Sequence, residues 1–344
     1  MSLDINDYYY NLPPSLIANK PSSKRDDCRL LCLNKQQNQI SHHHFCDLVD
    51  LLNQNDVLVL NQSKVFPARI FGKKDSGGDI EVLLIRQLKT NLWLAISKPR
   101  PQIGRKIMFD QKLVGIIIKS NPENGEIEIE FNFKNEKIFQ ILDKIGHTPI
   151  PPYIHSCQPE FQIRQDYQTV YATEIGSAAA PTAGLHFTKK LLSKLKKKGV
   201  QIEYITLHVG LGTFQNLRPE NIKTKTLHTE FYEIDSNTAN RLNLAKENGK
   251  RIVAVGTTTI RTLESAINSK NKINAGSCQT NIFIYPGFKF NFVDALITNF
   301  HLPKSSLLML VSAFAGKDKI FSAYQQAIDK KYRFFSFGDA MFIY

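Results

Sequence analysis

The sequence has no long hydrophobic run and no recognisable export signal. No stretch of its 344 residues approaches the roughly 20 apolar residues that a membrane-spanning helix requires. The opening residues Met1–Asp4 do not belong to a basic and then apolar signal region. We therefore expect a protein of the cytoplasm with no membrane partner.

Cysteines are few, and no two of them form a Cys-x-x-Cys pair. Five are scattered along the chain, which favours reduced thiols over a disulfide framework: Cys28, Cys32, Cys46, Cys157 and Cys278. The run of three histidines at 42–44, with Cys46, matches no standard zinc-ligand spacing, and Cys28 and Cys32 are too widely spaced for a zinc knuckle. We expect no metal site.

The apolar content is high enough for a large core, and positive charge is in excess. Hydrophobic residues make up 42% of the chain and charged residues 22%, which excludes a mainly disordered protein. The length suggests two domains. The formal net charge of +13 favours a polyanionic partner, above all a nucleic acid.

The middle of the sequence differs from its flanks in the pattern of apolar and turn-forming residues. Between about residues 65 and 133 short β-type runs are separated by turns such as Asn124-Gly125, a pattern typical of a small antiparallel barrel or sandwich. These runs are Ile80–Ile85, Leu92–Ile96, Val114–Ile118 and Ile127–Phe131. We predict an inserted β-barrel domain over residues 63–149.

The flanking segments, 1–62 and 150–344, indicate one discontinuous α/β domain. Strands are predicted at Val57–Leu60, Ile202–Val209, Arg251–Val255 and Ala295–Phe300. Three helices are predicted. The first ends in residues 45–52, and the second is capped by Thr188 and runs to Lys198. The third has Ile260, Leu263 and Ile267 on one face. Alternation of this kind implies a largely parallel sheet.

Two polar loops lie near the predicted strand at 202–209. Residues 176–187 combine small residues, which allow close approach to a ligand, with His186 just before a helix. Residues 206–214 include His208 at the end of a strand, where open α/β sheets bind ligands. Gly210-x-Gly212 is only half of a dinucleotide-binding motif, and a plain tight turn explains it equally well.

Two further polar segments follow the later strands. Residues 256–264 place Thr257 and Thr258 at a helix start that suits an anionic group, while Arg261 and Glu264 have the spacing to pair on the helix surface. The segment at 298–303 includes Asn299 and His301 at a strand end. A single histidine is more often structural, but three at strand ends or in loops favour one polar cluster at the sheet edge.

The helix after Thr188 has lysines opposite its apolar side. Such a face is normally only solvated, but with the net charge of the chain it is also a candidate surface for RNA phosphates. The candidate RNA-binding residues are Lys189, Lys190, Lys194 and Lys197, together with Arg69.

Taken together, these motifs resemble the S-adenosylmethionine:tRNA ribosyltransferase-isomerase family of queuosine biosynthesis. The matching segments occur in the family's order along nearly the whole chain: Leu12–Ala18, Pro67–Arg69, Tyr167–Tyr171, Ala179–Phe187, Leu207–Gly210, Val255–Thr258, Thr298–Pro303, Met309–Gly316 and Tyr332–Met341. The resemblance implies an α/β domain that carries a small β-barrel. It also implies transfer and isomerisation of the ribosyl group of S-adenosylmethionine onto 7-aminomethyl-7-deazaguanine in the tRNA anticodon, giving epoxyqueuosine, adenine and methionine.

This chemistry suggests roles for the polar residues. Neutral histidines suit the proton transfers, which makes His186, His208 and His301 the catalytic candidates. Arg261 is suited to the methionine carboxylate, Glu264 to orienting that arginine or the amine, and Phe187 or Phe214 to stacking on a base. The full set of substrate-binding candidates is Thr182, Gly184, Phe187, Gly210, Gly212, Phe214, Thr257, Thr258, Arg261, Glu264, His228, Glu230 and Asn299.

The resemblance also implies that S-adenosylmethionine is consumed as a substrate, with no cofactor, and we expect a monomer.

The chain departs from the family pattern at two positions: Lys225 stands where the first histidine of a His-x-Met-His-x-Glu string is usual, and Phe337 where a tyrosine is usual. Two other functions fit the sequence less well. A methyltransferase would need a glycine-rich loop after an early strand, which is missing. A non-catalytic RNA-binding protein would leave the histidine loops without a role.

Overall fold

The larger domain is built on a nine-stranded mixed sheet. The computed structural model describes residues 3–122, 125–151, 154, 158–210, 217 and 219–344. In spatial order the strands are β15 (Gly276–Ile282), β13 (Thr226–Ile234), β12 (Gln201–His208), β3 (Asp56–Asn61), β14 (Arg251–Val255), β16 (Ala295–Asn299), β17 (Ala340–Ile343), β1 (Arg29–Asn34) and β2 (Gln39–His44). The central four, β12, β3, β14 and β16, are parallel, so their carboxyl ends meet at one edge.

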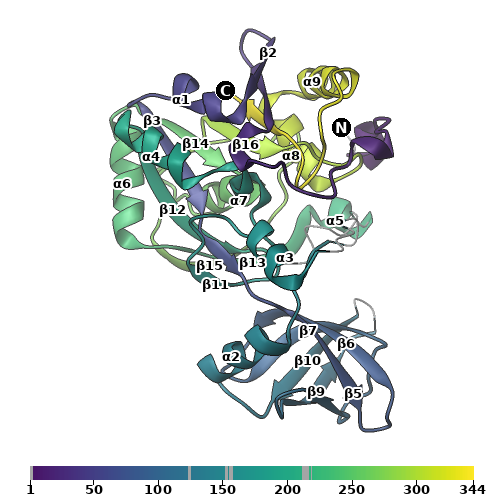
Figure 1. Ribbon diagram of the computed structural model, residues 1–344. Helices are drawn as coiled ribbons and strands as arrows, with labels where there is room; N and C mark the ends of the chain where they lie inside the picture. Colours follow the sequence, from purple (N-terminus) through teal and green to yellow (C-terminus); the bar gives the residue numbers. More distant parts are fainter. Residues whose placement is uncertain (1–2, 123–124, 152–153, 155–157, 211–216, 218) are drawn as a thin grey trace.

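Helices cover both faces of this sheet (Figure 1). Every residue of β3 is buried, and its side chains alternate: Val57 and Val59 pack into one core, Leu58 and Leu60 into the other. The first core is closed by α6 (Ser236–Glu247), α7 (Thr257–Ser265), α8 (Ser306–Ala315) and α9 (Lys317–Asp329), and the second by α1 (Leu48–Leu51) and α4 (Lys189–Lys197). Because both faces of the sheet are buried, the apolar run of β3 is continuous and does not alternate with polar residues.

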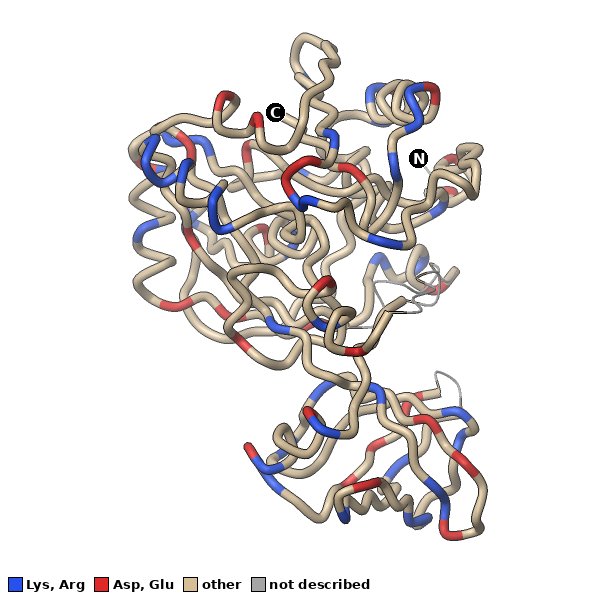
Figure 2. Tube along the Cα trace, in the orientation of Figure 1, with Lys and Arg blue, Asp and Glu red and all other residues tan. Residues whose placement is uncertain are grey.

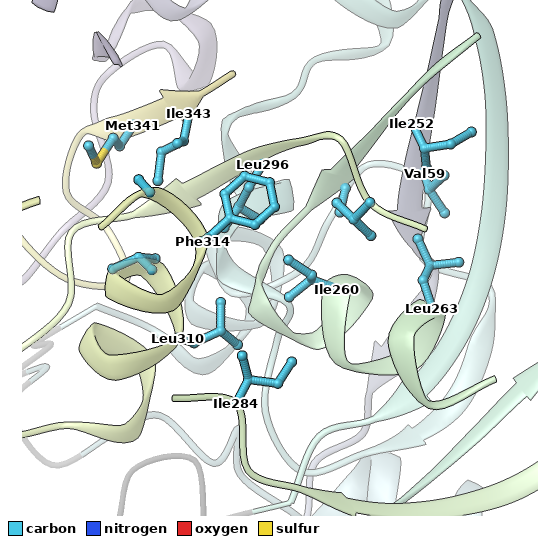
Figure 3. Packing of buried hydrophobic residues seen from close by; sticks show 14 of the residues in the cluster. Val59, Ile252, Ile260, Leu263, Ile284, Leu296, Leu310, Phe314, Met341 and Ile343 are labelled. Atoms are coloured by element: carbon cyan, nitrogen blue, oxygen red, sulfur yellow. The ribbon is translucent and has the colours of Figure 1, made fainter. Parts of the chain in front are cut away.

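Helix α7 is held tightly in the first core (Figure 3). Its Ile260 and Leu263 pack with Leu296 of β16 and Phe314 of α8, and all four side chains are buried. Burial of an aliphatic or aromatic side chain of this size stabilises the fold by about 1.5–3 kcal/mol. The helix that carries Thr257, Thr258 and Arg261 is thus fixed relative to the sheet.

The second domain is a closed barrel of six antiparallel strands, below the main domain in Figure 1. Its strands are β5 (Arg69–Lys74), β6 (Asp79–Gln87), β7 (Leu92–Lys98), β8 (Lys106–Phe109), β9 (Val114–Ser120) and β10 (Glu126–Phe131), and α2 (Glu136–Ile145) packs Ile138, Ile141 and Leu142 into the barrel core. The predicted fold class, an α/β domain with a small antiparallel barrel, is confirmed. The boundaries at 63 and 149 stay a prediction.

Short elements join the two domains. Strand β4 (Ser63–Val65) pairs with β11 (Glu174–Ser177) beside the main sheet, and α3 (Glu160–Asp166) lies next to the connection (Figure 1). Arg164 of α3 donates to the carbonyl oxygens of Asp143 (3.0 Å) and Gly146 (2.6 Å) at the end of α2. Main-chain hydrogen bonds also tie Arg69 to His147. The Arg164 hydrogen bonds fix where the barrel meets the larger domain, and the Arg69–His147 pair joins the two ends of the barrel segment.

Several local expectations differ from the structure. The helix expected to end at residues 45–52 is a 3-10 turn, Phe45–Asp47, followed by the four-residue α1, because β1 and β2 form a hairpin just before it. Helix α7 ends at Ser265, so Ile267 lies beyond it. The Thr188 hydroxyl caps α4 as expected, accepting from Leu191 N at 3.0 Å. The remaining short elements are η1 (Ile5–Tyr8), η2 (Pro14–Leu16), η3 (Arg25–Asp27), η5 (Thr182–His186) and α5 (Pro219–Thr224).

No helix among the described residues is long and apolar enough to cross a membrane.

Motifs from the two ends of the chain lie side by side: Ile17 forms a β-bridge with Phe334, and Ala18 N donates to Phe334 O at 3.1 Å. The motifs at 12–18 and 332–341 therefore form one structural unit.

Candidate active site

A pocket opens where the parallel strands end. It encloses about 530 Å³ of space, part of it open to solvent, and we call it the strand-end pocket. Its walls come from the loop before α4, from the ends of β12, β14 and β16, and from the segment before β17: Ala180, Pro181, Thr182, Ala183, Val209, Gly256, Thr257, Thr258, Thr298, Asn299, His301, Leu307, Phe335 and Ser336. This is the edge at which open α/β sheets bind ligands.

Five of the predicted site residues line this pocket: Thr182, Thr257, Thr258, Asn299 and His301. Gly256, with φ of 90°, allows the chain to turn from β14 directly into α7. The first turn of α7 thereby presents two threonines to the pocket, together with backbone N–H groups that have no partner within the helix.

Asn299 is held by a chain of buried polar groups. Its Nδ2 donates to Phe335 O at 3.2 Å and lies 3.0 Å from His186 Nε2, which therefore accepts. The proton of the neutral imidazole is then on Nδ1, 3.2 Å from Cys28 Sγ. Thr182 Oγ1 donates to the other end of the amide, Asn299 Oδ1, at 3.3 Å. His186 thus positions Asn299 from behind the pocket wall and does not itself line the pocket.

Both buried histidines of this region are neutral at pH 7. Burial, with the positive charges of Arg333 and Arg25, lowers the pKa of His186 to about 3. Burial alone lowers the pKa of His301 to about 3. His301 Nε2 lies 3.1 Å from Thr298 Oγ1, and its backbone N–H donates to the Tyr324 hydroxyl at 2.9 Å. Of the three predicted catalytic histidines, His301 is the one that lines the pocket.

A second polar cluster surrounds the buried side chain of Arg261. Its Nη1 forms an ion pair with Glu230 Oε2, and the other oxygen of Glu230 lies 3.2 Å from His228 Nε2 and 3.3 Å from Gly210 N. Although burial raises the pKa of Glu230, Arg261 and His228 outweigh it and hold that pKa at about 2. Glu230 is therefore a carboxylate at pH 7.

Arg261 has hydrogen-bonding capacity to spare. Its Nε and Nη2 are buried, and neither has a hydrogen-bond partner within the described part of the chain. A buried guanidinium N–H without a partner costs about 1–3 kcal/mol or more, so the arrangement favours an incoming acceptor. A carboxylate matches the planar geometry of such a group.

Glu264 does not take part in this cluster. Both it and Arg261 are buried, and the expected surface pair between them is not formed. The Glu264 carboxylate instead accepts hydrogen bonds from the backbone N–H groups of Asn291, Phe292 and Val293, at 3.0–3.1 Å. Its position in the structure is that of an anchor for this turn, and the expectation that it orients Arg261 has no contact to support it.

Other predicted residues do not line the strand-end pocket. The His208 ring is 6.2 Å from that of Phe231 and parallel to it, and burial lowers the pKa of His208 despite Glu174. Phe187 is fully buried and packs edge-to-face on Phe45, so it does not present a face to a base. Gly212 and Phe214 lie outside the described residues.

Gly184 has a packing role. A Cβ on this residue would lie 2.0 Å from the Tyr171 hydroxyl and 3.0 Å from Thr169 Cγ2. We expect Gly184→Ala to lower the free energy of unfolding by about 1–3 kcal/mol, since the partly buried Tyr171, whose hydroxyl is buried, has to shift. The urea midpoint measures this. The control is Gly78→Ala, where a Cβ meets only the flexible end of Lys74. An equal midpoint for both variants would contradict the close packing.

The predicted RNA-binding lysines are all exposed on α4: Lys189, Lys190, Lys194 and Lys197. Figure 2 shows basic residues distributed over both domains. Arg69, by contrast, is partly engaged, with Nε 3.2 Å from Glu81 Oε1 and Nη2 3.4 Å from Ile150 O.

Among the described residues no group of three or more His, Cys, Asp and Glu side chains could hold a metal, and His42–His44 lie in strand β2.

The two departures from the family pattern lie outside the strand-end pocket. Lys225 is exposed at the turn before β13, with φ of 56°, whereas His228 and Glu230 both lie in that strand. Phe337 packs edge-to-face on Tyr167, with ring centroids 6.0 Å apart.

One important residue is absent from the site residues that the sequence predicts. Asn61, at the end of β3, is fully buried; its Nδ2 donates to Leu207 O (3.0 Å) and Thr258 Oγ1 (3.3 Å), and its Oδ1 accepts from Leu207 N (3.1 Å). It therefore joins β3, β12 and α7 beneath the pocket. The signal was present, because Asn61-Gln62-Ser63 is a polar run directly after a buried strand.

The protein thus combines an α/β domain, with a pocket at the carboxyl edge of its sheet, and a six-stranded barrel. A family model described as "Queuosine biosynthesis protein" matches residues 5–343, so the chain belongs to the queuosine biosynthesis protein family. The family resemblance of the motifs is thereby confirmed, and with it the prediction that the chain is an enzyme.

A solved structure with a similar sequence is the S-adenosylmethionine tRNA ribosyltransferase of Thermotoga maritima. It is 36% identical to this chain, and the match covers 98% of this chain and 100% of that one, with a TM-score of 0.56. This similarity extends over both domains.

Proposed function

We propose that the enzyme transfers and isomerises the ribosyl moiety of S-adenosylmethionine onto 7-aminomethyl-7-deazaguanine at the tRNA wobble position, giving epoxyqueuosine-tRNA, adenine and methionine. The proposal rests on the family, on the ribosyltransferase name of the similar solved structure, and on the site. Arg261 is the observation that carries it, because Nε and Nη2 of this buried guanidinium have no hydrogen-bond partner among the described residues and suit the carboxylate of a methionine.

The amino-acid end of S-adenosylmethionine would lie against Arg261 and Glu230. Arg261 would donate to the methionine carboxylate, while the Glu230 carboxylate, held ionised, would accept from the methionine ammonium group. Glu230 Oε1 also accepts from Gly210 N, which ties the end of β12 to this subsite.

The ribose and adenine would then occupy the strand-end pocket. The sulfonium acidifies the neighbouring C5′ hydrogens, and removal of one of them requires a base. We assign this proton to His301, because it is the predicted catalytic histidine whose imidazole lines the pocket. Asn299 and Thr182 would hydrogen-bond the ribose or the leaving adenine, and the neutral aminomethyl group of the deazaguanine would attack.

The reaction needs no further cofactor, because S-adenosylmethionine supplies the transferred group and leaves as adenine and methionine. We propose that the enzyme acts as a monomer in the cytoplasm, with tRNA and S-adenosylmethionine as its partners and no membrane component.

Mass spectrometry of the products tests this function. The enzyme is incubated with S-adenosylmethionine and a tRNA that carries the deazaguanine precursor. We expect adenine, methionine and one modified nucleoside in equal amounts. S-adenosylhomocysteine and a methylated nucleoside would instead show a methyltransferase. Tight RNA binding without any product would show a binding protein.

A further inference from the structure

A second and larger opening lies between the barrel and the α/β domain. It encloses about 1130 Å³ of space, part of it open to solvent, and we call it the interdomain cleft. Phe66 and Pro67, on the connection into the barrel, form part of its lining, and so do Tyr167 and Gln168 after α3. Lys189, the first residue of α4, also lines it.

The lining of the cleft is rich in positive charge. Four of its residues are basic, Arg25, Lys64, Arg164 and Lys189, and Asp143 is the one acidic residue in the described lining. Arg164 is paired with Glu160 at 3.0 Å. Lys64 and Lys189 are exposed, and neither forms an ion pair with any described residue. Their charges are therefore free to act on a ligand.

Arg25 and Thr169 extend this lining. The Arg25 guanidinium is aligned by the carbonyl oxygens of Gln165 and Gln168, both at 2.6 Å, and no carboxylate of the described residues forms a hydrogen bond with it. Thr169 Oγ1 is buried and has no hydrogen-bond partner in the part of the chain that the structure describes. A buried hydroxyl of this kind is a ready donor to an anionic oxygen.

The interdomain cleft and the strand-end pocket share a wall. The pocket is lined by Pro181, Thr182 and Ala183. The next residue, Gly184, packs directly on Thr169, and Thr169 lines the cleft. Lys189 follows on the same segment. A chain molecule bound in the cleft therefore lies against the same segment of the chain that lines the pocket.

We propose that the interdomain cleft binds the phosphate groups of the single-stranded anticodon loop of the substrate tRNA, with Lys64 and Lys189 as the contacts and Arg25 beside them. This inference rests on the proposed function and adds the place at which the RNA docks. Phosphate contacts from lysine and arginine hold a nucleic acid in register without reading its sequence. The target base would then turn from the cleft into the strand-end pocket.

The test compares RNA binding by the full-length enzyme and two neutralised variants. The probe is an anticodon stem–loop RNA with the deazaguanine precursor, and the Kd is measured by fluorescence anisotropy over a range of salt concentrations. For the double variant Lys64→Gln/Lys189→Gln we expect the Kd to rise about tenfold near 0.1 M salt. The slope of log affinity against log salt should fall by about 1.4, since each lost contact removes about 0.7 for a single strand.

Lys270→Gln provides the matched control, because Lys270 is exposed in the turn after α7, at the end of that helix opposite the pocket. It should bind RNA like the wild type, and all three proteins should bind S-adenosylmethionine equally. Equal RNA affinity for the double variant and the wild type would overturn the cleft assignment, and so would an equal loss in Lys270→Gln. Absence of product from the wild type would instead contradict the proposed function, since binding is measured without turnover.

Discussion

Replacing Arg261 with lysine lowers kcat/KM for S-adenosylmethionine by about 10²- to 10⁴-fold. Lysine keeps the positive charge beside Glu230 but has no planar pair of N–H groups for the methionine carboxylate. Loss of two hydrogen bonds to a charged group, each worth about 1.5–3 kcal/mol, accounts for this factor. Steady-state kinetics at saturating tRNA measures it.

The control for Arg261 is Arg241→Lys. Arg241 also forms a two-nitrogen ion pair with a carboxylate: its Nε and Nη2 lie 2.8 Å and 2.7 Å from the oxygens of Glu203. Unlike Arg261, however, its side chain is half exposed on α6. This variant should keep wild-type kinetics. Arg261→Met is a harsher change, because it leaves Glu230 as a buried charge without its partner and should also destabilise the fold by about 3–5 kcal/mol. A normal kcat/KM for Arg261→Lys would remove the arginine from the substrate site.

Lowering the pH from 7 to 5 reduces the free energy of unfolding by about 2 kcal/mol for each of His186 and His301. The pKa of each is about 3 in the folded protein, but an unfolded histidine titrates near 6.5. The unfolded chain therefore takes up protons first, so stability is full above about pH 6.5 and is lost as the pH falls toward 3.

Urea midpoints at pH 7 and pH 5 measure this loss. Other groups also titrate in this range, so the informative quantity is the difference between the wild type and the variant His186→Gln/His301→Gln, which has no titrating side chain at either position. This double variant should show a pH-induced loss smaller by about 4 kcal/mol. His44→Gln, with an exposed side chain, is the control. The same pH-induced loss in the wild type and the double variant would show that these histidines are not protected from protonation.

The central strands were predictable because each is an apolar run that ends in polar residues. Val57–Leu60, Arg251–Val255 and Ala295–Phe300 all correspond to observed strands, and the carboxyl ends of the last two contribute to the pocket. In the barrel, β5 and β8 were not predicted. Lysines and a glycine interrupt the apolar pattern of β5, and only four residues make up β8.

The partners of the polar residues were less predictable than their positions. Arg261 and Glu264 have helical spacing, yet Arg261 pairs with Glu230, which is 31 positions away and lies in β13. Only the placement of β13 beside β12 brings that carboxylate to α7. In the same way, Cys28 and Asn299 meet at His186 through tertiary contacts that no local pattern encodes.

A crystal structure with S-adenosylmethionine bound tests the central claim most directly. We expect the methionine carboxylate within hydrogen-bonding distance of Arg261 Nε and Nη2, and the ribose between Thr182, Asn299 and His301 in the strand-end pocket. S-adenosylmethionine bound elsewhere, with Arg261 Nε and Nη2 still without partners, would contradict the account.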